Sequence, residues 1–344
     1  MNYDGFEIFV LSLGNADSIF IRKHSNGVKT NVLIDGGNSS DGSVVLGVLA
    51  SLGENHIDHL VCSHHHADHA GGLVEIVKSK TVTIGHAWMH VQELVSDLEV
   101  SLSRMFQNQE AFADKIATSK AIQKELLASL SGVPISHPFA GAQIGPLVVL
   151  SPTAEFYQRQ IERMQVESLQ TILNERYARR ADHSLAALAL KVLTEEAEER
   201  DGGLGGEPTS PENEVSTILA IVSPNNEIYL LTADAGVEAF ADTVKRYNLE
   251  ALHWMQIPHH GSRRNLNQDL IDYFRPKTSM ISARGSVKHP SKKLVNAVKG
   301  AGGKVYATYY PSREPSKGRW TRFCNGTVPQ ISTSTVPALW DENS

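Results

Sequence analysis

Four metal-binding side chains stand close together between residues 61 and 72, directly after an apolar run. His64 and His66 are separated by one residue at the end of a predicted strand, so their imidazoles leave the strand on the same side. Asp68 and His69 follow on the predicted turn and form a second pair beside the first. Imidazole and carboxylate ligands suit zinc, with manganese or iron as alternatives. The pattern therefore predicts two neighbouring divalent cations rather than a histidine-rich surface loop.

This run resembles the His-x-His-x-Asp-His signature of the metallo-β-lactamase superfamily, and four further segments resemble the same family in the same order. They are the strand and turn at 9–18, the strand and Asp-Gly-Gly at 31–37, the strand and turn at 229–235, and the loop at 257–262. More specifically, the chain resembles the hydrolase domain of the ComEC/Rec2 competence proteins and their stand-alone relatives. The resemblance covers residues 6 to 310 and implies an α/β fold, the αββα metallo-β-lactamase sandwich with inserted helices.

The resemblance also implies a ligand set. The expected ligands are His64 and His66 for one metal ion, Asp68, His69 and His260 for the other, and Asp234 bridging both. Because His259 and His260 are adjacent, only one is expected to bind metal. We place His260 on the metal and His259 toward the substrate as a general acid, with the reverse order as the alternative. Asp68, His259 and Asp234 are thus the expected catalytic residues.

The family places one more histidine ligand at the head of the strand pair that ends in the bridging aspartate. Here residues 213–216 stand at this place, and they contain no histidine. The candidates elsewhere are His86, His90, His137 and His183. His183, which precedes an apolar strand, is the first choice. Alternatively, His183 is an ordinary polar residue at the start of that strand and binds no metal. Without such a histidine, water or substrate would occupy the position and the first ion would bind weakly.

Three positions depart from the family pattern without removing a ligand. Asn15 and Ala16 replace the usual Gln and Gly, and Ala233 replaces the Gly before the bridging aspartate. If the backbone at 233 needs a positive φ, the methyl group of alanine will tighten the loop. Nearby, the resemblance implies that Asp17 holds the ligand loop in place, and a turn aspartate bonded to local backbone is the alternative.

Polar residues after the His-His-Gly loop are candidates for substrate binding. Ser262, Arg263 and Arg264 could bind a phosphate oxygen through a hydroxyl and two guanidinium groups. The alternative is that the serine caps a helix and the arginines are solvated. His289 lies in a His-Pro segment that lines the site's edge in competence-type domains. Lysines at 288, 292 and 293 could receive a nucleic-acid backbone there, although lysine-rich helix starts are common without any ligand.

Composition indicates an ordinary globular chain: 344 residues, 41% hydrophobic and 20% charged. The formal net charge is −6, so a positive electrostatic potential that binds phosphate can arise only from a local cluster of basic residues. The two cysteines, Cys62 and Cys324, fit a reducing compartment. Without a signal-like start or a long apolar run, we expect a cytoplasmic protein that does not bind a membrane.

The residue pattern predicts one metallo-β-lactamase-like domain over 1–344, with strands at 6–13, 17–23, 30–35 and 58–63 in its first half. Residues 91–131 and 155–180 are expected to be helical insertions, 195–214 a mobile acidic and Gly-rich loop, and 332–344 a loose tail. A hairpin is predicted around Asn325-Gly326. The inserted helices are a candidate surface for a protein partner or a homodimer.

Two adjacent divalent cations favour hydrolysis. We expect a dimetal phosphodiesterase that acts on DNA, RNA or a nucleotide-derived molecule. The alternatives are a small-molecule hydrolase for a phosphoester or lactone, and a catalytically weak, metal-stabilised interaction protein.

Overall fold

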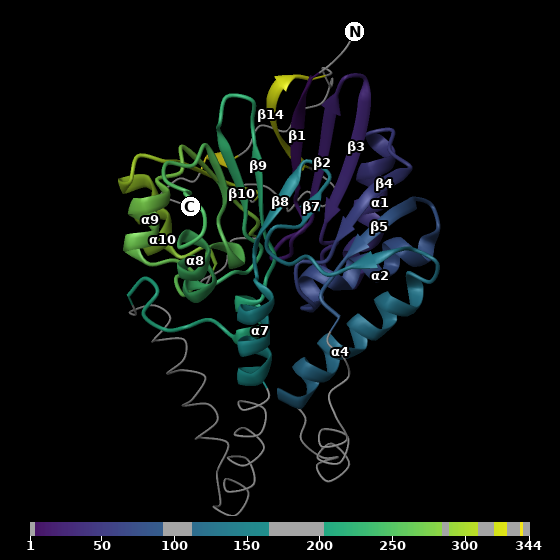
Figure 1. Cartoon of the computed structure of the whole chain (residues 1–344), viewed down its shortest axis with the longest axis horizontal. Coiled ribbons are helices and arrows are strands. Elements are labelled where there is room, and N and C mark those ends of the chain that lie inside the picture. The colour runs from purple at the N-terminus through teal and green to yellow at the C-terminus, as the bar shows by residue number, and fades with distance from the viewer. Residues whose placement is uncertain are drawn as a thin grey trace, which may run out of the picture.

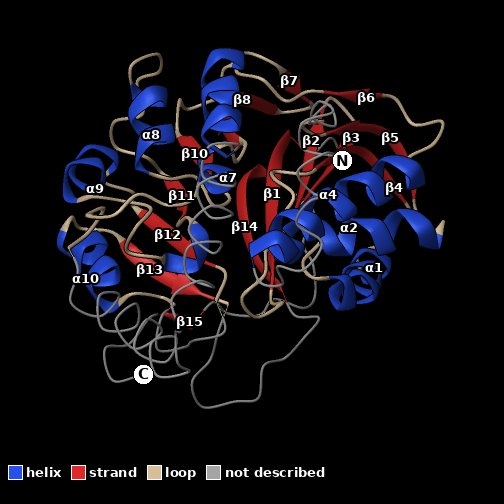
Figure 2. Ribbon diagram, turned by 90° about the horizontal axis from the view of Figure 1, so that it is seen from below, coloured by secondary structure: helices blue, strands red, loops and turns tan. Residues whose placement is uncertain are grey.

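Two β-sheets pack face to face in the computed structural model, and helices cover both outer faces (Figures 1 and 2). The structure describes residues 4–91, 112–164, 203–283, 289–308, 320–328 and 338–339. Helices α1, α2 and α4 lie against one sheet, and α8, α9 and α10 lie against the other. The αββα sandwich predicted from the sequence is therefore confirmed.

The first sheet has the strand order β14-β1-β2-β3-β4-β5-β6 within the described residues. Its strands are β1 Asp4–Leu11, β2 Ile19–Ser25, β3 Val28–Ile34, β4 His56–Val61, β5 Thr83–Trp88, β6 Ile135–Ser136 and β14 Trp320–Thr327. Its helices are η1 Ser39–Asp41, α1 Gly42–Ser51, α2 Ala67–Ser79 and α4 Phe112–Ser129. Helix α4 falls in the predicted insertion at 91–131, whose residues 92–111 lie outside the described part.

The second sheet has the order β15-β13-β12-β11-β10-β9-β8-β7 in the part of the chain that the structure describes. Its strands are β7 Gln143–Ile144, β8 Leu147–Ser151, β9 Ile218–Val222, β10 Ile228–Leu231, β11 Trp254–Gln256, β12 Thr278–Ile281, β13 Lys304–Ala307 and β15 Ala338–Leu339. Its helices are α7 Pro211–Glu214, α8 Val237–Val244, η2 His259–Gly261, α9 Gln268–Phe274 and α10 Lys292–Gly300. Residues 154–164 are helical as well, at the start of the insertion predicted at 155–180.

Three apolar cores hold the layers together. Strand β1 shows how, because Phe6, Ile8 and Val10 pack between the sheets while Phe9 and Leu11 pack toward α1 and α2. Every residue of β1 after Asp4 is buried, since both faces of the strand are covered. A third core joins the second sheet to α8, α9 and α10. This packing holds the ends of the strands in place, and the loops that carry the predicted ligands start from these ends.

Helix α2 begins at Ala67, directly after the ligand His66. Asp68 and His69 consequently lie in its first turn and not in a preceding turn. Gly71 and Gly72, in the next turn of α2, allow a close approach to the loop after β3: a Cβ at Gly72 would lie 1.9 Å from the carbonyl oxygen of Gly36. The Gly-Gly pair is thus a packing surface of the helix.

The loops that carry the predicted ligands leave one edge of the sandwich. β3 and β4 are parallel, as are β10 and β11. Asp35 and His64 follow β3 and β4, while Asp234 and His259 follow β10 and β11. Carboxyl ends of parallel strands meet at the same edge of a sheet, which is the usual place for a binding site.

The prediction of a hairpin at Asn325-Gly326 is wrong. Both residues lie inside the continuous strand β14, where Asn325 pairs with Phe6 and Gly326 with Gly5 of β1. A Cβ at Gly326 would lie 2.3 Å from the carbonyl oxygen of Asp4, so glycine serves close strand packing here. Among the described residues, no helix is both long and apolar enough to cross a membrane.

Candidate metal centre

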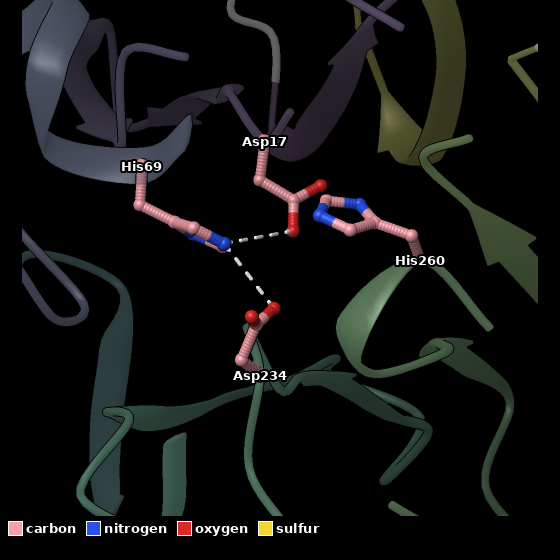
Figure 3. Close-up of side chains that lie close together, drawn as sticks. All are labelled: Asp17, His69, Asp234 and His260. Atoms are coloured by element: carbon pink, nitrogen blue, oxygen red, sulfur yellow. Dashed lines mark ion pairs between the residues drawn. The ribbon is translucent and has the colours of Figure 1, made fainter. Parts of the chain in front are cut away.

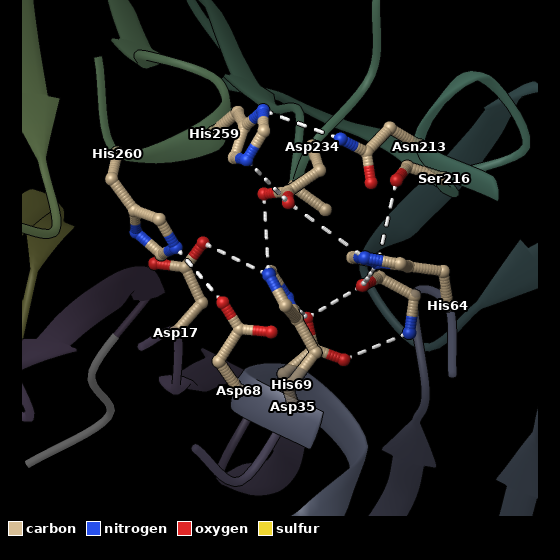
Figure 4. A network of polar contacts seen from close by, with 12 residues as sticks. Asp17, Asp35, His64, Asp68, His69, Asn213, Ser216, Asp234, His259 and His260 are labelled. Atoms are coloured by element: carbon tan, nitrogen blue, oxygen red, sulfur yellow. Dashed lines mark hydrogen bonds and ion pairs between the residues drawn. The ribbon is translucent and has the colours of Figure 1, made fainter. Parts of the chain in front are cut away.

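Two groups of ligand atoms, each contained within 4.8 Å, lie at this edge. The first contains His64, His66 and Asp234, and the second contains Asp17, His69, Asp234 and His260. Asp234 belongs to both groups, as the bridging position predicted for it requires. Figure 4 shows the side chains of Asp17, His64, His69, Asp234 and His260 converging from the two halves of the sandwich. The folded chain thus brings together ligands that stand up to 243 positions apart, from Asp17 to His260.

His69 is oriented by a carboxylate behind it. Its Nδ1 lies 2.8 Å from Oδ2 of Asp35, so the Nδ1–H donates there and Nε2 faces Asp234 Oδ1 at 3.2 Å. Burial by itself lowers the pKa of His69, but the charges of Asp234 and Asp35 raise it well above its usual value. Asp35 also accepts hydrogen bonds from the backbone and hydroxyl of Ser63, which precedes the first histidine ligand. One aspartate therefore supports both ligand pairs of the motif.

His64 presents its Nε2 to the first group. The hydroxyls of Ser63 and Ser216 lie 3.1 and 3.4 Å from its Nδ1, and Nε2 lies 3.7 Å from Asp234 Oδ2. Burial and the neighbouring His69 and His66 hold the pKa of His64 well below its usual value. The imidazole is therefore neutral at neutral pH, which is the form that binds a metal ion.

The donor atoms of these groups fit divalent cations. His64 Nε2 and Asp17 Oδ1 are buried without a regular hydrogen bond in the described structure, and the buried His69 Nε2 and Asp234 Oδ1 have only their contact with each other at 3.2 Å. Buried polar atoms nearly always have a partner, and a cation supplies one to nitrogen and carboxylate oxygen alike. The chemistry of the set, imidazole with carboxylate, suits zinc and also manganese.

The adjacent histidines of η2 take different places. His260 is buried in the second group: its Nδ1 donates to the Ser282 carbonyl at 2.8 Å, and its Nε2 lies 3.3 Å from Asp68 Oδ2. Burial lowers the pKa of His260, but the hydrogen bond to Asp68 and nearby carboxylates raise it to about 9. His259 is partly exposed beside the first group, with Nε2 3.7 Å from Asp234 Oδ2. The roles expected from the sequence, metal ligand for His260 and general acid for His259, stay predictions.

Positive backbone φ angles create this difference. His259, His260 and Gly261 have φ of 49°, 54° and 83°, so the chain turns sharply and sends the two imidazoles in different directions. Ala233, before the bridging aspartate, has φ of 44°, which is the tight conformation anticipated for an alanine in place of glycine. The backbone amide of His259 donates to the Ala233 carbonyl at 3.1 Å. The two strained turns therefore support each other.

No described histidine completes the first group. His86 hydrogen-bonds to the Ser136 hydroxyl at 2.9 Å, and the rings of His90 and His137 pack against Tyr157 and Phe139. His183, the first choice from the sequence, lies outside the described residues. Asn213 and Ser216, at the place where the family has a histidine, instead contact His259 and His64.

The predicted substrate-binding residues divide into two sets. His289 stands at the site, with its ring centre 5.5 Å from that of His259. Arg263 is buried and donates to the Gly203 carbonyl at 3.3 Å, while Arg264 pairs with Glu207 at 3.0 Å. Ser262 is buried too, and its hydroxyl accepts from the Arg264 amide at 3.3 Å. Substrate contacts by these side chains stay predictions.

Sequence reasoning missed the positions of two aspartates. Asp17 stands among the ligand atoms of the second group, and Asp35 holds His69. The only signal was that each follows a buried strand at a family-like turn. Their partners are more than 30 positions away along the chain, so no local spacing could reveal the contacts.

The αββα architecture and a buried histidine and aspartate centre at the strand ends define a dinuclear-type metal-binding protein. The chain belongs to the metallo-β-lactamase superfamily, whose family model matches residues 11–285. Members of this superfamily are largely metal-dependent hydrolases. No curated protein matches the chain.

The chain is also similar, at low identity, to solved structures. YhfI from Bacillus subtilis, a metallo-β-lactamase fold protein, is 11% identical, with 94% of this chain and 100% of that chain covered and a TM-score of 0.41. A putative metallo-β-lactamase from Thermotoga maritima is 12% identical, with coverage of 71% and 86% and a TM-score of 0.33. AidC, a dizinc quorum-quenching lactonase, is 12% identical, with coverage of 95% and 81% and a TM-score of 0.35. These likenesses carry no argument about the substrate.

Proposed function

We propose that the protein is a dimetal-dependent phosphodiesterase acting on nucleic acid or a nucleotide-derived substrate. The observation that carries hydrolysis is the position of Asp234. Its Oδ1 lies 3.2 Å from His69 Nε2 in one group and its Oδ2 lies 3.7 Å from His64 Nε2 in the other. A single carboxylate shared by two ligand groups supports a pair of adjacent cations at this edge.

Each protein group has a distinct task in this proposal. Two bound divalent cations would lower the pKa of a water molecule and stabilise negative charge on a phosphoryl oxygen. His64 and His66 would hold one ion, His69 and His260 the other, with Asp68 beside them at the more exposed side. Asp35 keeps Nε2 of His69 directed to the site. These contacts position the ligands before substrate arrives.

His259 is suited to move a proton. Its Nδ1 lies 3.1 Å from the side-chain oxygen Oδ1 of Asn265 and 3.2 Å from Nδ2 of Asn213. When the Nδ1–H donates to Asn265, Nε2 faces the site, and a proton taken up at Nε2 can be delivered there. Asn265 is itself fixed, because its Nδ2 donates to the Asp234 carbonyl at 2.8 Å. The His259 side chain is 28% exposed, so a substrate oxygen can reach it. We assign to it the protonation of the leaving oxygen.

The phosphodiester assignment rests on the motif likeness to competence-type hydrolases and on positive charge at the site's edge. His289 lies beside His259, and α10 begins nearby with Lys292 and Lys293. Lysines at a helix start can contact a nucleic-acid backbone, and such binding weakens steeply with salt. This part of the proposal concerns the substrate and is independent of the metal centre.

A specific observation supports a second candidate, hydrolysis of a small phosphoester or lactone. The arginines after η2 do not form an open basic groove, because Glu207 lies 3.0 Å from Arg264 and 4.0 Å from Arg263. The carboxylate offsets much of their charge. A substrate with little negative charge would then be accepted as readily as a polyanion.

The test is incubation of the zinc- or manganese-loaded protein with single- and double-stranded DNA, RNA, bis-p-nitrophenyl phosphate and an acyl lactone. Asp68→Ala and Asp234→Ala are the inactive variants, and Asp41→Asn, a buried aspartate outside both ligand groups, is the matched control. Metal-dependent cleavage of a polymer or of the diester, lost only in the first two variants, supports the proposal. Turnover of the lactone alone shifts the assignment to the second candidate, and no turnover at all points to an interaction protein.

A further inference from the structure

We propose that Asp17 is a direct ligand of the second metal ion, together with His69, Asp234 and His260. The sequence pattern assigned this aspartate only to the support of a loop or turn. Figure 3 shows its carboxylate between the imidazoles of His69 and His260 and across from Asp234. The inference rests on the metal centre and not on the substrate, so a failure of the phosphodiesterase proposal would leave it standing.

The first argument is distance. One ligand atom from each of these four residues lies within 4.8 Å of all the others. Asp17 Oδ2 is 4.0 Å from His69 Nε2, which in turn is 3.2 Å from Asp234 Oδ1. Atoms that share one zinc ion at about 2.0–2.2 Å lie roughly 3 to 4 Å apart. The group is close to this spacing before any ion has drawn it together.

The second argument is the orientation of the Asp17 carboxylate. Gln256 Oε1 accepts from the backbone amides of Thr232 and Ala233 at 3.0 and 3.2 Å, which fixes the direction of its amide. Its Nε2 must therefore face Asp17, and it donates to Oδ2 at 3.2 Å. Asp17 Oδ1 is buried and no hydrogen bond of regular geometry reaches it in the described structure, although the Ser282 side chain lies close to the carboxylate. An oxygen left in this state has a vacant acceptor site for a cation.

The third argument is the anchoring of the turn. The Asp17 amide donates to the Asp68 carbonyl at 3.0 Å, and the Asp17 carbonyl accepts from the Gly37 amide at 2.9 Å. These bonds tie the turn to the first turn of α2 and to the loop after β3. The Asp17 carboxylate therefore has a set position relative to His69.

The fourth argument is charge. The Asp17 side chain is 3% exposed, and no lysine or arginine of the described residues pairs with it. Asp234 adds a second buried carboxylate nearby. Two buried carboxylates need positive charge beside them, which the imidazoles of His69 and His260 can supply when protonated and a divalent ion can supply when they are neutral ligands.

Asp68, the carboxylate ligand expected from the motif, lies at the margin of this group. Its side chain is 32% exposed, and it approaches His260 Nε2 at 3.3 Å without joining the four atoms within 4.8 Å. Asp17 therefore occupies the inner position and Asp68 the outer one. The second ion would be held chiefly from the protein interior.

The experiment compares metal content and stability of Asp17→Asn with those of the wild type. Dialysis against zinc-buffered solution followed by elemental analysis should give two zinc ions per wild-type chain and one per Asp17→Asn chain, or at least a 10-fold weaker second site. Asp41→Asn, the matched buried control, should keep two ions. Two ions with unchanged affinity in Asp17→Asn would overturn the inference.

Thermal unfolding with and without metal gives a second readout. In EDTA, Asp17→Asn should raise the melting temperature because it removes one of two neighbouring buried carboxylates, Asp17 and Asp234, whereas with zinc the variant should melt below the wild type. A residue with only a structural role would lower the melting temperature in both conditions. If Asp17→Asn does not fold, a crystal structure of the zinc-loaded wild type decides. A distance of more than about 3 Å between Asp17 Oδ1 and both zinc ions would refute direct ligation.

Discussion

Asp35 Oδ2 lies 2.8 Å from Nδ1 of His69, and this contact determines which nitrogen of the imidazole faces the second metal group. Asp35 itself has a φ of 58° at the end of β3, a left-handed conformation that turns its side chain back toward α2. A residue that never touches the metal thus controls a ligand.

Replacing Asp35 with asparagine should weaken zinc binding by about 10- to 100-fold, because the amide cannot hold His69 Nδ1–H and both Ser63 donors as the carboxylate does. Competition with a chromogenic chelator measures the affinity. Asp41→Asn serves as the control for loss of a buried carboxylate. Affinity within twofold of wild type would show that the orientation of His69 does not depend on Asp35.

The adjacent histidines should separate metal binding from proton transfer. His260→Asn is expected to lose one zinc ion, because His260 belongs to the second ligand group. His259→Asn should keep both ions and reduce kcat by about 10²- to 10⁴-fold, the usual range for loss of a general acid. Elemental analysis and steady-state kinetics of the two variants test this. The reverse pattern would assign His259 to the metal.

Gly72→Ala should destabilise the protein by about 1–3 kcal/mol, since the new Cβ would lie 1.9 Å from the Gly36 carbonyl oxygen and push α2 away. Zinc affinity should fall as well, because Asp68 and His69 lie in the first turn of this helix. The matched control is Gly47→Ala in α1, where the Cβ meets nothing within 4 Å. That variant should gain about 0.5–1 kcal/mol. Urea unfolding compares both, and equal effects would contradict the close-packing argument.

Glu214 should make stability depend on pH. Burial raises its pKa from the ordinary 4.5 to about 7, although Oε2 accepts from the Ala239 amide at 2.8 Å. The folded state therefore holds a proton that the unfolded state releases, so stability falls as pH rises from about 4.5 to about 7 and is level beyond.

Glu214→Gln removes this titration. The variant should match the wild type near pH 4.5 and exceed it at pH 8 by a margin on the order of 1–3 kcal/mol, measured by urea unfolding at both values. A wild-type profile that stays flat between these pH values would rule out the raised pKa.

Local residue patterns were sufficient for much of the fold. Apolar strands bounded by turns gave the two halves of the sandwich, and the alternation of His64 and His66 placed their side chains on one side of the chain. Such features depend on neighbours within a few positions, which a sequence displays directly. The positive φ of Ala233, considered from the sequence as a condition of the family turn, is likewise a property of one turn.

Other features depended on contacts between distant segments. The Asn325-Gly326 pair reads as a hairpin turn, yet pairing with β1 keeps it inside a strand. Asp68 and His69 read as a turn, yet they lie in α2, where Gly71 and Gly72 let the helix approach the loop after β3. In both cases tertiary packing outweighed local conformational preference.

The sequence by itself determined that this chain carries a histidine and aspartate metal motif on an αββα frame, because ligand spacing along a strand and a helix follows from backbone geometry. Only the tertiary structure placed Asp17 among the ligands, put Asp35 behind His69 and separated His259 from His260. Those relations arise where the ends of parallel strands from both sheets meet, and the distances there are set by packing of the two layers rather than by separation along the chain.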